Sequence, residues 1–369
     1  MLKTKKIITG LLKKADIQIN GQREWDIQVH DERFYSSVFW GDSLALGESY
    51  MKKWWDCNKL DLFFEKIMEA SINKRVNHHK WLLKLKSILF NLQSTLRSKE
   101  VIDKHYDLDY ELFSTFLDPY NQYTCGYFKN TTDLDTAQIQ KMDLICKKLQ
   151  IKPGEKVLDI GCGWGGFAKY AAEHYGCHVT GITISEKQAE YARQFTKGLP
   201  VTILKQDYRE LKGKFDKIVI AGMIEHVGYK NYRKLIKIVN NCLKEDGLFL
   251  LHTIGQNHTS THGNPWVNKY IFPNGMTPSV KQITTAYESI FTLEDWHNFG
   301  LYYADTLMAW DEKFQKNWPK IAPEYSETFY RMWRYYLTSY AAAFKTHQLQ
   351  LWQIVFSKGG DKKVYESVR

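Results

Sequence analysis

The sequence has few cysteines, and their arrangement is not that of a metal-binding or disulfide-rich protein. Six cysteines occur in 369 residues, with no CxxC pair and no zinc-finger spacing. His258 and His262 lie in a loop-like stretch and add no converging set of ligands. We therefore expect reduced thiols, a cytoplasmic protein and no metal site.

Long apolar runs, internal repeats and low-complexity tracts are also absent. No run reaches the roughly 20 apolar residues that a transmembrane helix needs. The first residues, MLKTKKIITGLLKK, are basic and only briefly apolar, and no small-residue cleavage site follows them, so we expect no signal peptide. If the protein meets a membrane, we expect it to bind peripherally, at the inner face.

The chain does carry an excess of positive charge. Its formal net charge is +10 and its pI is near 9.0, which favours an anionic partner, either nucleic acid or a membrane surface. Residues 1–100 hold 18 Lys and Arg against 12 Asp and Glu, so most of the excess is N-terminal. Since no RNA-binding or DNA-binding module is recognisable, we predict no nucleic-acid partner and favour anionic phospholipids.

Residues 71–99 form the most basic stretch. They contain seven Lys or Arg and no acidic residue, interleaved with apolar residues such as Trp81, Leu85 and Phe90. Such a basic amphipathic segment suits an anionic lipid surface. It equally suits a linker helix whose apolar face packs internally, and the sequence does not separate the two.

Composition and pattern divide the chain into three parts. We predict a small, lipid-associated module over residues 1–70, a basic amphipathic linker over 71–104 and a catalytic domain over 105–369. In the first part DIQIN and FYSSVFW look like strands, and an amphipathic pattern follows over residues 49–70. Its aromatic residues are expected to lie mostly in the core; they are Trp40, Trp54, Trp55, Phe63 and Phe64.

The stretch VLDIGCGWGG, residues 157–166, is the strongest single signal. A hydrophobic strand that ends in a glycine turn brings backbone close to a nucleotide-like ligand. A dinucleotide site would usually place Asp or Glu after the second strand, but CHVTGITIS offers Thr183 near that position. Asp207 follows the third strand, where it can accept from an adenine amino group. This order favours S-adenosylmethionine over a nicotinamide cofactor.

The remaining pattern predicts an α/β fold of the class I S-adenosylmethionine methyltransferase (Rossmann-like) type, with helical lipid-facing additions and the small N-terminal domain. Strands are expected at KVLDIG, HVTGIT, VTILKQD, KIVIAG, GLFLLHTI and LQLWQIVFS.

Nine blocks in order carry a closer resemblance. They are HYDLDYELFSTFLDPYNQYTCGYF, LDIGCGWGGFAKYAA, GITISEKQAEYA, GMIEHVG, FLLHTIG, PWVNKYIFPNG, EDWHNFG, DTLMAW and LQLWQIVFSKG. With these blocks the chain resembles the bacterial cyclopropane fatty acid synthase family over about residues 104–360, and more loosely before that.

The resemblance implies an activity. Enzymes of this family transfer a methylene group from S-adenosylmethionine to a cis double bond of a phospholipid acyl chain, through a carbocation, with bound bicarbonate as the base. It also implies a homodimer. The anion cage carried over by motif is Cys125, Glu225, His252, the backbone at Ile254, and Tyr303.

The cofactor contacts carried over in the same way lie in the cysteine block, the glycine turn and the two segments after the next strands. They are Tyr123, Thr124, Gly161, Gly163, Thr183, Gln188, Asp207 and Tyr208. Trp266, Tyr270 and Phe272 are expected to line part of the acyl tunnel, although aromatic residues there suit an ordinary core equally well. Three alternatives stay open: an acyl-chain methyltransferase that closes no ring, a nucleic-acid methyltransferase, and a lipid-binding protein without activity.

Overall fold

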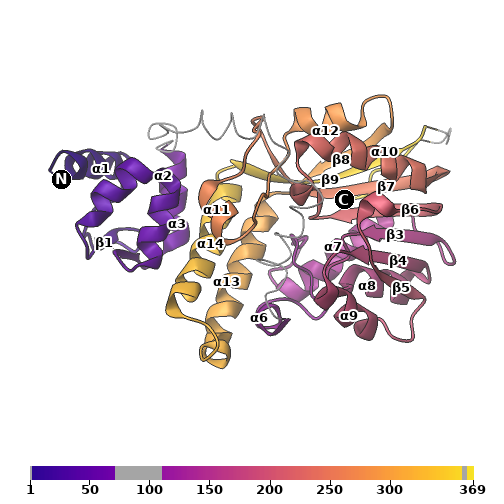
Figure 1. Cartoon of the computed structure of the whole chain (residues 1–369), viewed down its shortest axis with the longest axis horizontal. Coiled ribbons are helices and arrows are strands. Elements are labelled where there is room, and N and C mark those ends of the chain that lie inside the picture. Colours follow the sequence, from indigo (N-terminus) through magenta and orange to yellow (C-terminus); the bar gives the residue numbers. More distant parts are fainter. Residues whose placement is uncertain (1, 71–109, 360–363) are drawn as a thin grey trace.

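The computed structural model describes residues 2–70, 110–359 and 364–369 (Figure 1). The predicted linker over 71–104 and its basic segment lie outside the described residues. The division of the chain into three parts therefore stays a prediction.

A seven-stranded sheet forms the centre of the larger part of the molecule, with strand order β5-β4-β3-β6-β7-β9-β8. The strands from β5 to β7 are parallel, and β9 runs antiparallel between β7 and β8. The strands are β3 Lys156–Ile160, β4 His178–Thr183, β5 Val201–Lys205, β6 Phe215–Ala221, β7 Leu243–Gln256, β8 Thr292–Asn298 and β9 Leu349–Ser357.

All six strands expected from the sequence are confirmed, and so is the fold class. The seventh strand, β8, was not predicted. It lies at the sheet edge and has one buried residue, Asp295, among seven, so it shows neither an apolar run nor an alternation of apolar residues.

Helices cover both faces of the sheet, as a parallel sheet requires. On one face α7, α8 and α9 share a core with Val157, Val219 and Leu250 of the strands. On the other face α10 and α12 pack over Leu158, Ile220 and other strand residues. The helices are α7 Leu134–Lys148, α8 Gly166–Tyr175, α9 Glu186–Phe195, α10 Tyr232–Cys242 and α12 Val280–Tyr287.

A helical layer joins the sheet to the N-terminal module (Figure 1). Its long helices are α13 Leu301–Ile321 and α14 Glu327–Lys345, and the short helices are α6 Tyr110–Ser114 and α11 Pro265–Tyr270. One continuous core includes residues of the module, of α13 and α14, and of the segment 112–128. The helical additions therefore share their interior with the segment that leads to the glycine turn.

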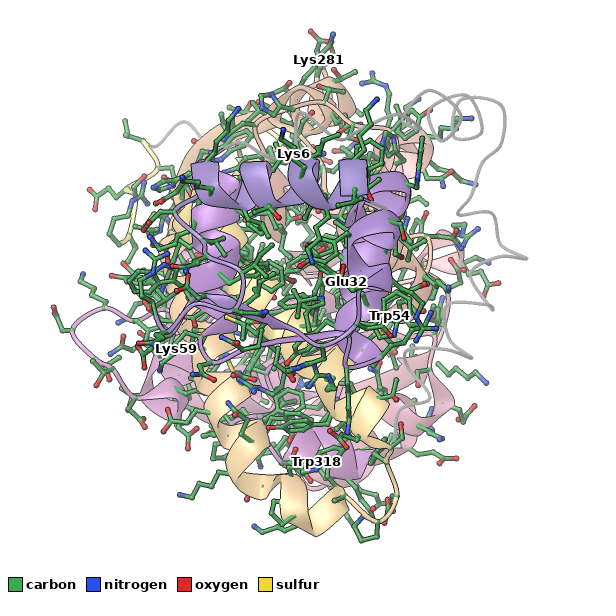
Figure 2. All side chains as sticks on the ribbon, turned by 90° about the vertical axis from the view of Figure 1, so that its left-hand side faces the viewer. Lys6, Glu32, Trp54, Lys59, Lys281 and Trp318 are labelled. Carbon is green, nitrogen blue, oxygen red and sulfur yellow. The ribbon has the colours of Figure 1, made fainter. Side chains whose placement is uncertain are left out.

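The N-terminal module contains α1 Leu2–Lys14, β1 Ile27–Val29, α2 Arg33–Met51, β2 Trp55–Cys57 and α3 Leu60–Glu69. Figure 2 shows it end-on, with Lys6 on α1 and with Trp54 and Lys59 on either side of β2. It is held to α14 by Arg331, whose Nε donates to the Tyr50 carbonyl at 2.6 Å and whose Nη2 donates to the Trp55 carbonyl at 2.9 Å. The Arg331 guanidinium also lies over the Tyr50 ring.

Two expectations for this module were wrong. FYSSVFW is not a strand but the first part of α2, because Phe34 and Val38 recur at helical spacing and pack against the same core. DIQIN contributes only an isolated bridge between Ile19 and Ile27.

Of the five aromatic residues expected in the core, Trp55, Phe63 and Phe64 are buried. Trp40 is 67% exposed, and Trp54 is partly exposed between Arg33 and Lys52.

Among the described residues, no helix combines the length and apolar character needed to cross a membrane.

Gly166, the first residue of α8, makes a close contact that admits no side chain. A Cβ there would overlap the carbonyl oxygen of Tyr120 and crowd the Gln122 amide. We expect Gly166→Ala to lower the free energy of unfolding by about 1–3 kcal/mol or more, because backbone must move. Gly10→Ala is the matched control, since nothing lies within 4 Å of a Cβ in α1. Denaturant unfolding checks the pair, and equal stabilities would contradict this packing.

Candidate active site

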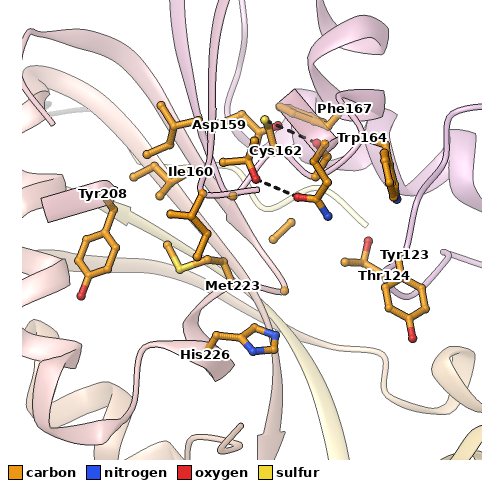
Figure 3. Close-up of a pocket in the computed structure, with 18 of the residues that line it drawn as sticks. Tyr123, Thr124, Asp159, Ile160, Cys162, Trp164, Phe167, Tyr208, Met223 and His226 are labelled. Atoms are coloured by element: carbon orange, nitrogen blue, oxygen red, sulfur yellow. Dashed lines mark hydrogen bonds between the residues drawn. The ribbon is translucent and has the colours of Figure 1, made fainter. Parts of the chain in front are cut away.

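A cavity of about 200 Å³ lies at the carboxyl ends of β3, β4 and β6 (Figure 3). The turn after β3 forms one side of it, with Gly161 at φ +86° and Gly163 at φ +53°. Both values lie in the left-handed region, which glycine adopts without strain. The turn is held because the amides of Gly161 and Cys162 both donate to the Ile182 carbonyl at 2.9 Å.

The structure brings all eight predicted cofactor residues to this first cavity. They are Tyr123, Thr124, Gly161, Gly163, Thr183, Gln188, Asp207 and Tyr208. The Thr183 hydroxyl donates to Gln188 Oε1 at 2.8 Å, which orients the Gln188 amide. One Asp207 oxygen accepts from the Arg209 backbone N–H and from Arg209 Nε, each at 2.9 Å. Their individual contacts with a cofactor stay predictions.

Asp159 is a cavity residue that the sequence reasoning missed. It lies in the buried part of β3, two residues before Gly161, and is 3% exposed. Burial raises its pKa to about 7, and the charge of Lys141 opposes that shift. The sequence did contain a signal for this residue: an acidic side chain at the end of a strand that leads into a glycine turn lies close to the ligand, where it can pair with a cationic group.

A second cavity, of about 120 Å³, adjoins the first. Tyr123, Thr124, Gly222 and His226 line both cavities and form the wall between them; the side chains of Tyr123, Thr124 and His226 can be followed in Figure 3. We call these four residues the shared wall. Because the two cavities meet at these residues, a group bound in one can lie against a group bound in the other.

Helix α7 fixes the shared wall with two fully buried side chains. Lys141 Nζ donates to Thr124 Oγ1 at 2.8 Å and also to Gln122 Oε1. Gln138 Nε2 donates to the Thr124 carbonyl at 2.8 Å. Burial lowers the Lys141 pKa to about 8, with nearby acidic groups opposing the shift. Thr124 is thus held at both its hydroxyl and its backbone.

The second cavity contains four of the five predicted cage positions: Glu225, His252, Ile254 and Tyr303. Cys125 is fully buried but lines neither cavity. Its thiol donates to the Gly126 carbonyl at 3.1 Å and lies 4.0 Å from Thr306 Oγ1. Cys125 is therefore outside the lining of both cavities, and a direct contact of its thiol with an anion stays a prediction.

Glu225 and His252 each present a polar atom that has no hydrogen-bond partner among the described residues, Oε2 and Nε2 respectively. Glu225 Oε1 accepts from the Ile254 backbone N–H at 2.8 Å, so that amide holds the carboxyl in place. Burial raises the pKa of Glu225. Burial, with the charges of Lys141 and Lys148, lowers the pKa of His252 well below its usual value and keeps the ring neutral. Buried polar atoms usually have hydrogen-bond partners, so these two atoms are places where a ligand or a bound water can be held.

The expected acyl-tunnel residues separate into two groups. Phe272 lines the second cavity, together with Tyr303, Tyr336 and Tyr340. Trp266 is buried against Tyr335. Tyr270 donates to Glu48 Oε1 of α2 at 2.9 Å. Neither Trp266 nor Tyr270 lines the second cavity, so a place for them in an acyl tunnel stays a prediction. Both contact α2 of the N-terminal module, Trp266 at Gly47 and Tyr270 at Glu48. Among the described residues, no three His, Cys, Asp or Glu side chains come together as a metal site would need.

The sheet, the glycine turn and the cavity beside it define the class of the protein: it is an S-adenosylmethionine-dependent methyltransferase with a Rossmann-like catalytic sheet. Residues 93–354 match the family described as mycolic acid cyclopropane synthetase, and the chain belongs to that family.

Known proteins of this kind resemble the chain over most of its length. It is 51% identical to the cyclopropane-fatty-acyl-phospholipid synthase of Escherichia coli strain K12, over 96% of this chain and 93% of that protein. It is 36% identical to a probable fatty acid methyltransferase of Pseudomonas putida, over 70% and 69% of the two chains. The crystal structure of mycolic acid cyclopropane synthase CmaA1 complexed with SAH and CTAB matches 71% of this chain and 98% of that one, with 31% identity and a TM-score of 0.66.

Asp159 predicts a proton release on cofactor binding. With a pKa of about 7 in the free protein, the carboxyl is largely protonated at pH 6, and a cationic cofactor nearby lowers that pKa. S-adenosylmethionine, which carries a sulfonium and an ammonium group, should therefore displace protons at pH 6 and few at pH 8. Calorimetry in two buffers of different ionisation enthalpy measures the number of protons released per cofactor bound. Asp159→Asn should abolish the release and the exposed control Asp246→Asn should keep it; proton uptake by the wild type would contradict the assignment.

Proposed function

We propose that this protein transfers a methylene group from S-adenosylmethionine to a cis double bond in an acyl chain of a membrane phospholipid, forming a cyclopropane ring. The observation that carries the proposal is the shared wall. At this wall the first cavity meets a second cavity, whose lining includes aromatic side chains and two polar atoms that have no partner in the described part of the chain. The 51% identity to the Escherichia coli synthase, over 96% of this chain, supports the same substrate class.

The chemistry explains why the second cavity is aromatic. An alkene is a poor nucleophile, and its attack on the sulfonium methyl leaves a neutral thioether and a carbocation on the acyl chain. Water would capture that cation, so the cavity must exclude water. Tyr303 and Tyr336 are buried and Tyr340 is half-buried, and all three line the cavity. The face of an aromatic ring stabilises a nearby cation.

Ring closure then requires loss of one proton from the transferred methyl group. The second cavity fits bicarbonate as the base, because His252 Nε2 and Glu225 Oε2 have no partner among the described residues and Tyr303 lines the same space. His252 and Tyr303 would hold the anion as donors. Glu225, with its raised pKa, would share a proton with it. In this arrangement the bound anion, and not a side chain, takes the proton.

An acyl-chain methyltransferase that closes no ring is the second candidate, since a relative carries the name probable fatty acid methyltransferase. The two candidates share the methyl transfer and differ in the step that follows it. Incubation of the protein with S-adenosylmethionine and vesicles of cis-unsaturated phospholipid separates them. Proton NMR of the isolated acyl chains should show cyclopropane methylene signals, and mass spectrometry should show one added CH₂. A methyl branch would support the second candidate, and an unmodified lipid would overturn both.

Glu225→Gln tests the second cavity. Glutamine keeps the acceptor for the Ile254 N–H but cannot exchange a proton with a bound anion. We expect kcat to fall by a factor on the order of 10² or more, as for loss of a general acid or base, with little change in S-adenosylmethionine affinity, because Glu225 does not line the first cavity. The exposed control Glu190→Gln should behave as the wild type. Equal loss of turnover and affinity would instead indicate a folding defect.

We also propose that the protein is a homodimer that binds anionic phospholipids peripherally at the cytoplasmic face of the membrane. The basic composition of residues 71–99 supports the lipid preference, and two catalytic units on one membrane would gain avidity.

Charge neutralisation tests the membrane proposal. Replacing five basic residues of the segment 71–99 by Gln should weaken binding to anionic vesicles, and the loss should shrink as salt rises, because screened charges contribute less. The residues are Lys74, Arg75, Lys80, Lys84 and Lys86. Vesicle co-sedimentation measures the change.

A control carries the same charge change elsewhere. It replaces exposed lysines of the catalytic part by Gln, namely Lys152, Lys197, Lys212, Lys234 and Lys237. If both variants lose the same affinity, net charge rather than this segment determines binding. If neither does, the segment has no role at the membrane.

A further inference from the structure

Three polar side chains form a row across the antiparallel end of the sheet. His252 on β7 is paired with Gln353 on β9, and Gln353 is paired with His297 on β8. His252 and Gln353 are each 1% exposed or less. Because directly paired residues of neighbouring strands present their side chains on the same face of the sheet, the Gln353 amide lies beside the His252 ring, and Gln353 itself does not line the second cavity.

The contact in this row involves one ring nitrogen of His252. Gln353 Nε2 lies 3.3 Å from His252 Nδ1. An amide nitrogen donates and does not accept, so Nδ1 must be the accepting, unprotonated nitrogen. The neutral ring then carries its hydrogen on Nε2, the atom that has no partner among the described residues and belongs to a residue lining the second cavity.

The surroundings of the row favour this neutral form. Lys148 of α7 lies 3.2 Å from His297 Nδ1 and forms an ion pair with Asp295 at 3.1 Å. Arg369 pairs with the same carboxylate at 2.6 Å. The charges of the buried Lys141 and Lys148 act on His252, and within the described ranges its Nδ1 contacts the Gln353 amide rather than a carboxylate.

We infer that Gln353 is a positioning residue, which fixes the tautomer of His252 so that Nε2–H points as a donor into the second cavity. A carboxylate in its place would accept from Nδ1 and leave a lone pair on Nε2, which repels an anion. An apolar side chain would offer Nδ1 neither a donor nor an acceptor and so would not fix the tautomer. Glutamine makes a neutral histidine a donor. That this donor serves a bound anion rests on the proposed function; the tautomer itself does not.

Histidine NMR tests the tautomer directly. The protein contains 12 histidines, so the His252 signals are assigned in ¹⁵N-histidine-labelled protein by their loss in His252→Asn. Two-bond ¹H–¹⁵N correlations, recorded without cofactor, lipid or bicarbonate, should show Nε2 protonated and Nδ1 unprotonated. The opposite pattern in the wild type would overturn the inference, because Gln353 would then be accepting through its oxygen.

Gln353→Met tests the role of the side chain with nearly the same volume. We expect mixed tautomer signals, and a KM for bicarbonate raised by about tenfold while the KM for S-adenosylmethionine stays unchanged. Gln348→Met is the matched control. Gln348 is exposed and lies just before β9, and its side-chain Nε2 makes one long hydrogen bond, to the Met68 carbonyl at 3.4 Å. An unchanged tautomer in Gln353→Met would contradict the inference.

The two proposals fail in different ways. If the wild type shows the Nε2–H tautomer but its rate does not depend on bicarbonate, the tautomer assignment stands and the anion is removed from the proposed function. If the rate depends on bicarbonate but Nδ1 carries the hydrogen, the role of Gln353 is overturned and the anion remains.

Discussion

The hydrogen bonds from α7 to Thr124 are the interactions on which the two cavities depend. Lys141 holds the Thr124 hydroxyl and Gln138 holds its carbonyl, and the same residue lines the cofactor cavity on one side and the second cavity on the other. The loop before it is fixed by Asp118, which accepts from the backbone N–H groups of Tyr120 and Gln122. A displaced wall would misalign the methyl donor and the acceptor, whose reaction needs close approach and correct orientation.

This arrangement is costly to build, since a fully buried lysine loses its hydration. Lys141 recovers part of that cost through two side-chain acceptors and through the nearby carboxyl groups of Asp118 and Asp159. Its charge also acts at a distance, because it helps to keep His252 neutral. One buried cation therefore links the position of the wall to the protonation state of the second cavity.

The sequence predicts those parts that depend on local pattern, and fails where register or tertiary packing decides. The glycine turn and the six apolar strands have clear local signals, and they bring the predicted cofactor residues to one cavity. The polar edge strand β8 has no such signal. The composition of FYSSVFW favours a strand, but in the structure this segment is the first part of α2, where its apolar residues pack at helical spacing. Lys141 and Gln353 look ordinary in the sequence. Their roles follow from the contact of α7 with the wall and from the pairing of β9 with β7.

The central claim is that a methyl group passes directly from the cofactor in the first cavity to an acyl chain in the second, where the two cavities meet, and then loses one proton there. The most direct measurement uses S-adenosylmethionine with a fully deuterated methyl group and cis-unsaturated phospholipid vesicles, followed by mass spectrometry of the modified acyl chains. The account predicts that the product retains two of the three deuterons, because one leaves as the ring closes. Retention of all three would contradict it, since the transferred methyl group would then have stayed intact.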